Sequence, residues 1–258
     1  MAAFGRLVVL LLIAAVGLQL YFLCRIALMT VVDPQSTTFQ RSEAWRLLVQ
    51  TQRLPWRQQW VASERISNQL KRAVIASEDA GFVEHSGVEW DALEKAWERN
   101  QLAQARADRQ NERLERQAAN AKSAAAPATA PRKVAPKVVG GSTITQQLAK
   151  NLFLSPERSF VRKGQEFAIT FMLESVLGKR RILEIYLNNV EWGEGLFGAE
   201  AAAQHYFRVP AAQLGGLQAA RLAVMLPAPK RFEKRVNSPY MNARASTIAA
   251  RMGAVELP

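Results

Sequence analysis

Three short stretches of the sequence carry side chains that can move protons or bind an anion. The first contains the adjacent carboxylates Glu78 and Asp79, and the second places Arg162 one helical turn before Glu166. Side chains at that spacing meet on a helix. The third, residues 179–188, opens with three basic residues and continues with a glutamate and a tyrosine. Carboxylates ringed by cations suit sugar transfer from a phosphorylated donor, because one carboxylate acts as a base while Lys or Arg stabilises the departing charge.

Each of these features also has a plain structural explanation. Acidic pairs at helix ends are common on protein surfaces, and an exposed ion pair contributes only about 0.2–1 kcal/mol. The basic start of 179–188 is typical of a solvated helix end, and His85 and His205 are more often structural residues than bases. The sequence has no pair of histidines or cysteines at helical spacing, no G-x-S-x-G elbow and no Walker-type loop, so metal, serine-hydrolase and nucleotide chemistry have little support.

The stretch GGSTITQQLAKN, residues 140–151, predicts a helix that follows a glycine turn. Thr143 and Gln146 have the spacing of a capping box, in which the hydroxyl accepts from the N3 amide and the glutamine reaches back to the N-cap amide. Apolar residues then recur every four positions from Ile144, which indicates one buried face. The stretch is either a well-capped surface helix or one wall of a binding site. On the polar face of the predicted helix, Gln146 lies one turn before Lys150 and Gln147 lies one turn before Asn151, so we expect each two side chains to pair.

The composition indicates a folded, basic protein. At 258 residues the chain is long enough for one sizeable domain with its own core. A formal net charge of +12 predicts acidic partners, which include nucleic acid, anionic lipid headgroups and phosphorylated substrates. Cys24 is the only cysteine in the sequence, which excludes an internal disulfide and a cysteine-based zinc site.

The N-terminal region predicts a membrane anchor over residues 1–32. Residues 7–24 form an 18-residue run without a formal charge, and the chain continues with apolar residues after Arg25. A bilayer-spanning helix needs about 20 apolar residues, whereas the apolar part of a signal peptide has ~7–15 and ends at a small-x-small cleavage site. No convincing site of that kind follows the run, and too few charges flank it to fix its orientation. Residues 33–68 form a polar neck, whose tryptophans lie at the membrane interface or pack into the domain.

The remaining pattern is helical, so the predicted fold class is mainly α. Residues 121–138 are low-complexity Ala/Pro/Lys sequence, which cannot build a core and predicts a flexible linker or loop. Strand-like runs are scarce, and the glycines at 193, 195 and 198 mark a tight loop. The predicted helices are 69–77, 90 to about 120, 160–177, 181–188, 199–207 and 214–226, besides the one that begins near Thr143.

Four stretches in this order, EDAGFVEHSG, GGSTITQQLAKN, RSFVRKGQE and KRRILEIYLNN, resemble the signature blocks of the peptidoglycan glycosyltransferases of the family 51 type. The resemblance covers about residues 69–252, and we expect the glycosyltransferase domain to span 69–258. The short chain with one N-terminal anchor is most similar to the monofunctional members. Because the chain ends early and lacks S-x-x-K and K-T-G motifs, we expect no transpeptidase domain.

The resemblance implies a lysozyme-like, mainly α fold with a head lobe, a jaw lobe resting on the membrane, and one N-terminal transmembrane helix. It implies that lipid II is polymerised on the outer, periplasmic face of the bacterial cytoplasmic (inner) membrane. The reaction would invert the anomeric carbon, form β-1,4-linked glycan and release undecaprenyl pyrophosphate. The implied partners are lipid II, the growing glycan strand, the membrane and other cell-wall synthesis proteins. No cofactor is expected; assistance by a divalent cation is compatible with a pyrophosphate, but we expect no dedicated metal site.

The resemblance assigns roles to individual residues. Glu78 matches the general base that deprotonates the 4-hydroxyl of the acceptor lipid II, and Asp79 beside it shapes its environment. Glu166 matches the second catalytic glutamate, to which we assign the organisation of the cations around the donor. The matched substrate-binding positions are Asp79, Lys95, Thr143, Gln147, Lys150, Asn151, Arg158 and Arg162, of which Lys150 and Arg158 match pyrophosphate-facing positions.

The sequence departs from the family pattern at about 98–137, where a low-complexity insertion separates the first two stretches. We assign it no function, because long surface insertions are tolerated at low cost. Two alternative functions remain. One is a lysozyme-like glycan-cleaving enzyme, which the cation cluster disfavours; the other is a non-catalytic, membrane-anchored cell-wall scaffold, which the two glutamates disfavour. We expect no nucleic-acid binding, because the basic residues are not interleaved with exposed aromatics in a recognised module.

Overall fold

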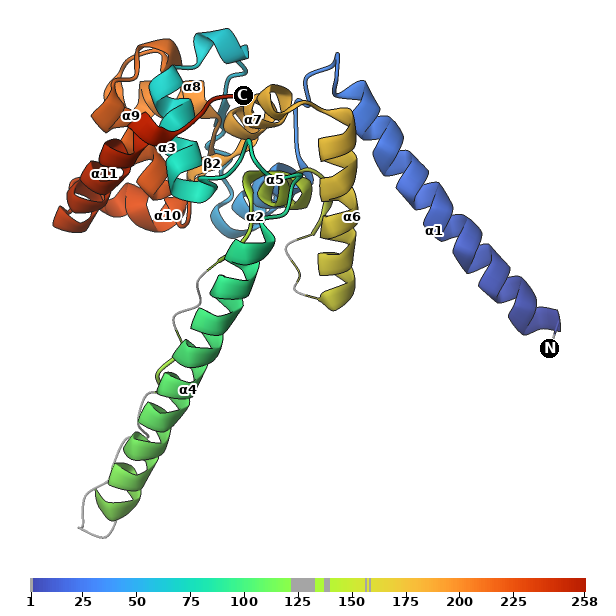
Figure 1. Ribbon diagram of the computed structural model, residues 1–258, viewed down its shortest axis with the longest axis horizontal. Coiled ribbons are helices and arrows are strands. Elements are labelled where there is room, and N and C mark those ends of the chain that lie inside the picture. Colours follow the sequence, from blue (N-terminus) through green and yellow to red (C-terminus); the bar gives the residue numbers. More distant parts are fainter. Residues whose placement is uncertain (1, 122–132, 137–139, 156, 158) are drawn as a thin grey trace. The chain divides into compact units, whose positions relative to one another are not determined.

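The computed structural model describes residues 2–121, 133–136, 140–155, 157 and 159–258 (Figure 1). The chain forms two compact units, one of residues 1–88 and 143–258 and one of residues 89–142. The helices are α1 (Ala2–Leu28), α2 (Thr38–Thr51), α3 (Asn68–Glu78), α4 (Trp90–Ala121), α5 (Ile144–Phe153), α6 (Phe160–Val176), α7 (Lys179–Asn189), α8 (Ala199–Phe207), α9 (Gly216–Met225), α10 (Pro229–Phe232) and α11 (Pro239–Arg251), with short 3-10 turns at Ser63–Arg65, Ala211–Gln213, Glu233–Arg235 and Met252–Ala254; the strands are β1 (Arg57–Gln58), β2 (Glu191–Gly193) and β3 (Leu196–Phe197).

The core of the first unit lies between two groups of helices. In one group α3, α9 and α11 pack against one another, and in the other α5 packs against α2, α6 and α7. Figure 1 shows the first group in cyan, orange and red, and α5 and α6 in olive and gold. Apolar faces of α3, α5, α6, α7, α9 and α11 meet in one cluster, which includes Leu70, Ile144, Leu148, Ile169, Leu173, Ile182, Ile185, Leu222 and Ile248. The prediction of a mainly α fold is therefore confirmed.

A small sheet, which the sequence pattern did not predict, ties the segment before α3 to the loop after α7. Its strand order is β1-β3-β2, with β1 parallel and β2 antiparallel to β3. Gly195 allows the close approach, because its φ is +67° and a Cβ there would lie 1.8 Å from the carbonyl oxygen of Pro55. Strands of two or three residues are too short to show an alternating pattern.

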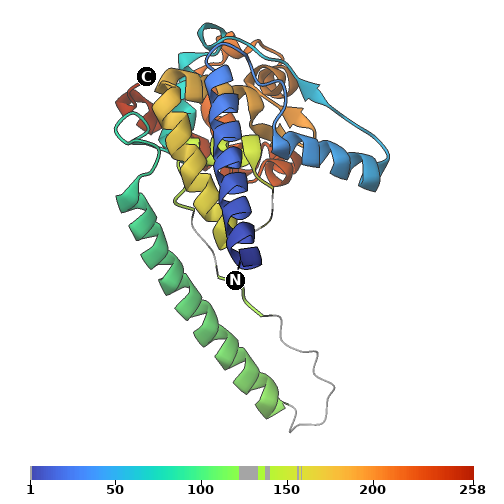
Figure 2. The same cartoon turned by 90° about the vertical axis from the view of Figure 1, so that its right-hand side faces the viewer.

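Helix α1 is the one described helix that is long and apolar enough to cross a membrane. Residues 3–28 have a mean hydropathy of 2.6, and nearly all of the helix surface is exposed. The helix lies beside α6, where the side-chain amides of Gln19 and Gln165 exchange two hydrogen bonds of 3.0 and 2.9 Å (Figure 2). The Phe22 ring also meets Phe153 edge-on at 5.3 Å.

The segment 33–68 contributes side chains to the first unit. Trp56 packs against Phe197 with ring centroids 4.6 Å apart, and the guanidinium of Arg181 lies over the Trp60 ring. Trp45, on α2, is 71% exposed. Two of the three indoles thus pack into the domain, and the third faces solvent. The boundaries between the anchor, the neck and the glycosyltransferase domain stay predictions.

The second unit consists of α4 and the chain that returns along it. The side chain of Asn111 binds both backbone groups of Val134, accepting from its N–H at 2.7 Å and donating to its carbonyl at 3.1 Å. Gly141 also fits closely, because a Cβ there would lie 3.0 Å from the Ala96 Cβ. Residues 133–136 of the predicted linker are therefore held against α4, and its residues 122–132 and 137–138 lie outside the described part. The less exposed side of α4 follows three- and four-residue steps through Ala96, Asn100, Ala103, Ala107, Asn111, Leu114 and Ala118.

A partly buried charge cluster in the first unit predicts that stability depends on pH. Lys230 forms ion pairs with Glu43 of α2 and with Glu191 of β2, the latter at 3.3 Å. Burial raises the pKa of Glu191 to about 7, and the nearby Glu43 charge raises it further while Lys230 opposes the shift. The folded state therefore binds this proton more tightly than the unfolded chain, so the free energy of unfolding falls as pH rises from about 4.5 to about 7.

Over this pH range we expect the free energy of unfolding of the unmodified chain to fall by up to about 3 kcal/mol. The Glu191→Gln protein should not show this fall, because glutamine does not titrate. Urea unfolding of both proteins at pH 5 and pH 8 measures the difference. Parallel stability profiles for the two proteins would show that Glu191 does not titrate as described.

Candidate active site

Glu78 is the last residue of α3, and its carboxylate faces α5. Gln147 donates from Nε2 to Oε2 at 3.0 Å, and Ser77 donates to Oε1 at 3.3 Å. Burial raises the pKa of Glu78; the two hydrogen bonds lower it and the Asp79 charge raises it, with a net upward shift. A half-buried carboxylate with raised proton affinity has the property that a general base needs near neutral pH.

Asp79 is buried and holds the start of α5 next to Glu78. One of its carboxylate oxygens accepts from the backbone N–H of Ile144 at 2.9 Å, and the other accepts from His85 Nε2 at 2.7 Å. His85 Nδ1 in turn accepts from the backbone N–H of Gly87 at 3.1 Å, which assigns the ring proton to Nε2. A carboxylate at the first turn of a helix is also favoured by the helix dipole. Asp79 therefore positions α5 relative to the end of α3.

The predicted capping box at the start of α5 is confirmed. The Thr143 hydroxyl accepts from the Gln146 backbone N–H at 3.2 Å, and Gln146 Oε1 accepts from the Thr143 backbone N–H at 3.1 Å. The same hydroxyl donates to the carbonyl of Gly87 at 2.6 Å. Gln146 is thereby buried and turned back to the cap, so it does not form the predicted polar face with Lys150. Because the Thr143 hydroxyl is engaged within the fold, its substrate contact stays a prediction.

Glu166 is buried on α6 between two cations of the preceding turn. Arg162 Nη1 lies 2.9 Å from one carboxylate oxygen and Lys163 Nζ lies 2.5 Å from the other. The predicted pairing of Arg162 with Glu166 is confirmed, and Lys163 joins it. Arg162 Nε is buried and has no hydrogen-bond partner among the described residues. The group carries one net positive charge, because two cations surround one carboxylate.

The remaining predicted site residues are placed as follows. Gln147 is half-buried and bonded to Glu78, whereas Lys150 in the last turn of α5 is exposed and Asn151 is half-buried. Lys95 is exposed on α4, which belongs to the second unit. Arg158 lies outside the described residues. The roles given to these residues in substrate binding stay predictions.

The contacts that Lys179 and Tyr186 make near the site were not predicted from the sequence. Lys179, at the start of α7, is not solvated, because its Nζ donates to the carbonyl of His85 at 2.6 Å and pairs with Glu174 at 2.8 Å. Glu174 also accepts a hydrogen bond from the Thr145 hydroxyl. The hydroxyl of Tyr186 donates to Gln147 Oε1 at 2.9 Å. No local pattern in the sequence indicates where a buried hydroxyl points.

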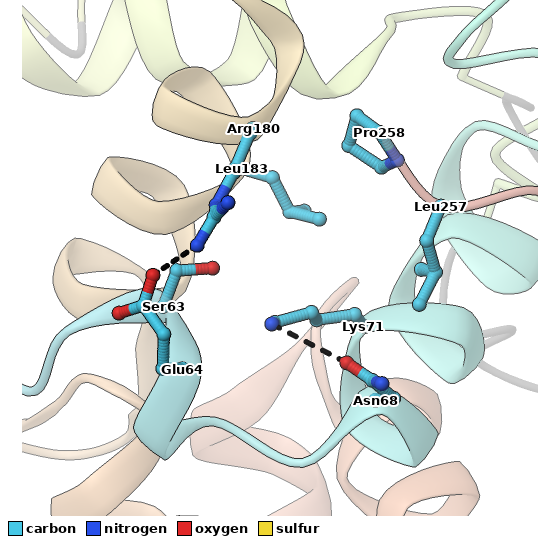
Figure 3. Close-up of a pocket in the computed structure, with 8 residues that line it drawn as sticks. All are labelled: Ser63, Glu64, Asn68, Lys71, Arg180, Leu183, Leu257 and Pro258. Atoms are coloured by element: carbon cyan, nitrogen blue, oxygen red, sulfur yellow. Dashed lines mark hydrogen bonds and ion pairs between the residues drawn. The ribbon is translucent and has the colours of Figure 1, made fainter.

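A separate cavity of about 370 Å³ lies in the first unit, between the start of α3, the start of α7 and the C-terminal residues (Figure 3). Lys71 and Arg180 bring positive charge to it, and Glu64 pairs with Arg180. Burial, and then the Arg180 charge, lower the pKa of Lys71. None of the predicted site residues lines this cavity, so it is distinct from the environment of Glu78.

Comparisons with known proteins identify the family of the chain. The family model described as Transglycosylase matches residues 46–110 and 119–253. The chain is 52% identical to a biosynthetic peptidoglycan transglycosylase of Burkholderia thailandensis, with 93% of this chain and 82% of the relative covered. It is 48% identical to the protein of that name from Paraburkholderia xenovorans, with 95% of this chain and 90% of the relative covered.

Several observations now point the same way. Hydrogen bonds bring three of the four sequence stretches together around Glu78 and Asp79, and the other stretch supplies the Glu166 group. The architecture is mainly α with one long apolar N-terminal helix, and the family match spans most of the chain. The chain belongs to the peptidoglycan transglycosylase family, and it is a glycosyltransferase of peptidoglycan biosynthesis with a lysozyme-like fold.

Proposed function

We propose that this protein polymerises lipid II into β-1,4-linked glycan strands, with inversion at the donor sugar and release of undecaprenyl pyrophosphate. The observation that carries the proposal is the environment of Glu78, a half-buried carboxylate whose pKa is raised and whose Oε2 is held by Gln147. The same unit contains the Glu166 group with its surplus positive charge. A base and an anion-stabilising group are the two requirements of this transfer.

In the proposed reaction, Glu78 takes the proton from the 4-hydroxyl of the acceptor. The oxygen then forms a bond to the anomeric carbon of the donor from the face opposite the pyrophosphate, so the configuration inverts. The bond from that carbon to the pyrophosphate oxygen breaks, and its electron pair leaves with the pyrophosphate. Gln147 stabilises one oxygen of the base throughout, because Oε2 accepts its hydrogen bond.

The departing pyrophosphate needs positive charge that is already in place. We assign this role to Arg162 and Lys163, which Glu166 holds in position, and to Lys150 and Arg158, which match family positions. Lys95, Asn151 and Thr143 are proposed to contact the substrate further along its length. These cations supply charge without a metal, and assays with and without Mg²⁺ measure any contribution from a divalent ion.

We further propose that α1 is a single-pass anchor in the cytoplasmic membrane and that the rest of the chain lies on its outer, periplasmic side. The length and hydropathy of α1 support the anchor. Phe160 and Val161, fully exposed apolar residues at the start of α6, suit a surface next to lipid. The net charge of +12 favours an anionic leaflet and an anionic substrate. Partners among other cell-wall synthesis proteins stay a prediction.

The decisive experiment incubates the purified full-length chain with lipid II in detergent and separates the products by length. We expect glycan polymer that muramidase degrades. Release of sugars from finished sacculi without polymer formation would favour a glycan-cleaving enzyme. A folded protein with neither activity would favour the scaffold alternative.

A further inference from the structure

Three side chains from different helices form a continuous chain of hydrogen bonds that ends on Glu78. The Tyr186 hydroxyl, on α7, donates to Gln147 Oε1 on α5 at 2.9 Å, and Gln147 Nε2 donates to Glu78 Oε2 at 3.0 Å. Tyr186 is only 1% exposed. The hydroxyl therefore has no bulk water to bond with, and Gln147 is its partner in the fold.

The chemistry of the three groups sets the direction of this chain. An ionised carboxylate can only accept hydrogen bonds, so the amide of Gln147 must turn its NH₂ group toward Glu78. Its carbonyl oxygen then points to Tyr186, and the hydroxyl must act as donor. If the amide were reversed, its carbonyl oxygen would face the carboxylate oxygen of Glu78 and repel it.

Tyr186 remains a donor under all conditions in which the enzyme would work. Burial raises its pKa well above its ordinary value, and the charges of Glu78 and Asp79 raise it further. The hydroxyl therefore stays protonated at physiological pH. The buried Tyr186 O–H finds its acceptor, the Gln147 carbonyl, only in the orientation that directs the amide protons at the base, and leaving a buried donor unpaired is costly.

We propose that Tyr186 is a positioning residue for Glu78: it fixes the side-chain amide of Gln147, which holds Oε2, while Oε1, which also accepts the longer bond from Ser77 at 3.3 Å, receives the acceptor proton. The proposal rests on the proposed function, in which Glu78 is the base. The hydrogen bond from Gln147 serves both protonation states, since Oε2 accepts whether or not Oε1 carries a proton. No proton moves along the chain; Tyr186 acts only through Gln147.

The test replaces Tyr186 with phenylalanine, which removes the hydroxyl and keeps the ring. Tyr206→Phe is the matched control, because that hydroxyl also makes one hydrogen bond within the first unit, to the carbonyl of Trp192 at 2.9 Å. In lipid II polymerisation we expect Tyr186→Phe to lower kcat about tenfold with little change in KM. The acid limb of its pH profile should move to higher pH, because Glu78 loses a well-oriented donor that lowers its pKa. Tyr206→Phe should match the unmodified enzyme in both respects.

A second measurement separates this proposal from the proposed function. The Glu78 carboxyl is titrated by NMR in the full-length chain labelled with ¹³C-glutamate, with its signal assigned from its loss in Glu78→Gln. We expect a higher pKa in Tyr186→Phe than in the unmodified chain and in Tyr206→Phe, even if no polymer forms. An unchanged Glu78 titration in Tyr186→Phe would overturn the positioning role. A shifted titration in a chain without polymerase activity would support the positioning role and reject the proposed polymerisation of lipid II.

Discussion

Replacing Glu78 with glutamine should lower the rate of lipid II polymerisation by about 10²- to 10⁴-fold, the usual contribution of a positioned general base. Glutamine preserves the shape of the side chain but cannot take the acceptor proton. The loss should appear in kcat more than in KM, because proton transfer belongs to the transition state. In the unmodified enzyme the acid limb of the pH profile should lie above the ordinary value of 4.5 for a glutamate, since burial raises the pKa of Glu78.

Folding should survive this substitution. Burial disfavours the ionised form of Glu78, so a neutral amide should not weaken the fold at neutral pH. Glu64→Gln is a suitable control, because it removes an exposed carboxylate of the same unit that pairs with Arg180. Turnover near that of the unmodified chain in a folded Glu78→Gln protein would reject Glu78 as the base.

Glu166→Gln is expected to reduce polymerisation by roughly 10²-fold, the scale seen when one preorganised stabilising group is lost. Without the negative charge, Arg162 and Lys163 repel each other, and the glutamine amide keeps an acceptor oxygen for only one of the two contacts of 2.9 and 2.5 Å that hold them. The cations would then no longer be aligned with a departing pyrophosphate. Glycan synthesis measured at saturating lipid II separates this effect from weaker binding.

The control for Glu166→Gln uses an ion pair whose two residues are also four positions apart but whose side chains are not buried. Glu112 lies 3.9 Å from Arg116 on α4, and both side chains are largely exposed. Glu112→Gln should change activity and stability little, because exposed pairs contribute ~0.2–1 kcal/mol. If Glu166→Gln behaved like Glu112→Gln, the proposed organisation of the donor cations would be wrong.

Local spacing was enough to predict much of the architecture. The capping box of Thr143 and Gln146, the ion pair of Arg162 and Glu166, the apolar faces of the helices and the long apolar α1 all follow from residues within one or two turns of each other. Such contacts are set by the geometry of the helix itself, so the sequence pattern already contains them. The order of the four stretches likewise indicated the family before the fold was known.

Tertiary packing decided how these parts meet. Asp79 binds the backbone of Ile144 from 65 residues away, and Lys179 reaches the carbonyl of His85 across 94 residues. The chain from Tyr186 through Gln147 to Glu78 joins three helices, and the small sheet forms from strands too short to have a pattern. No local spacing specifies these contacts, because a buried polar group takes whichever partner the packing of distant helices places beside it.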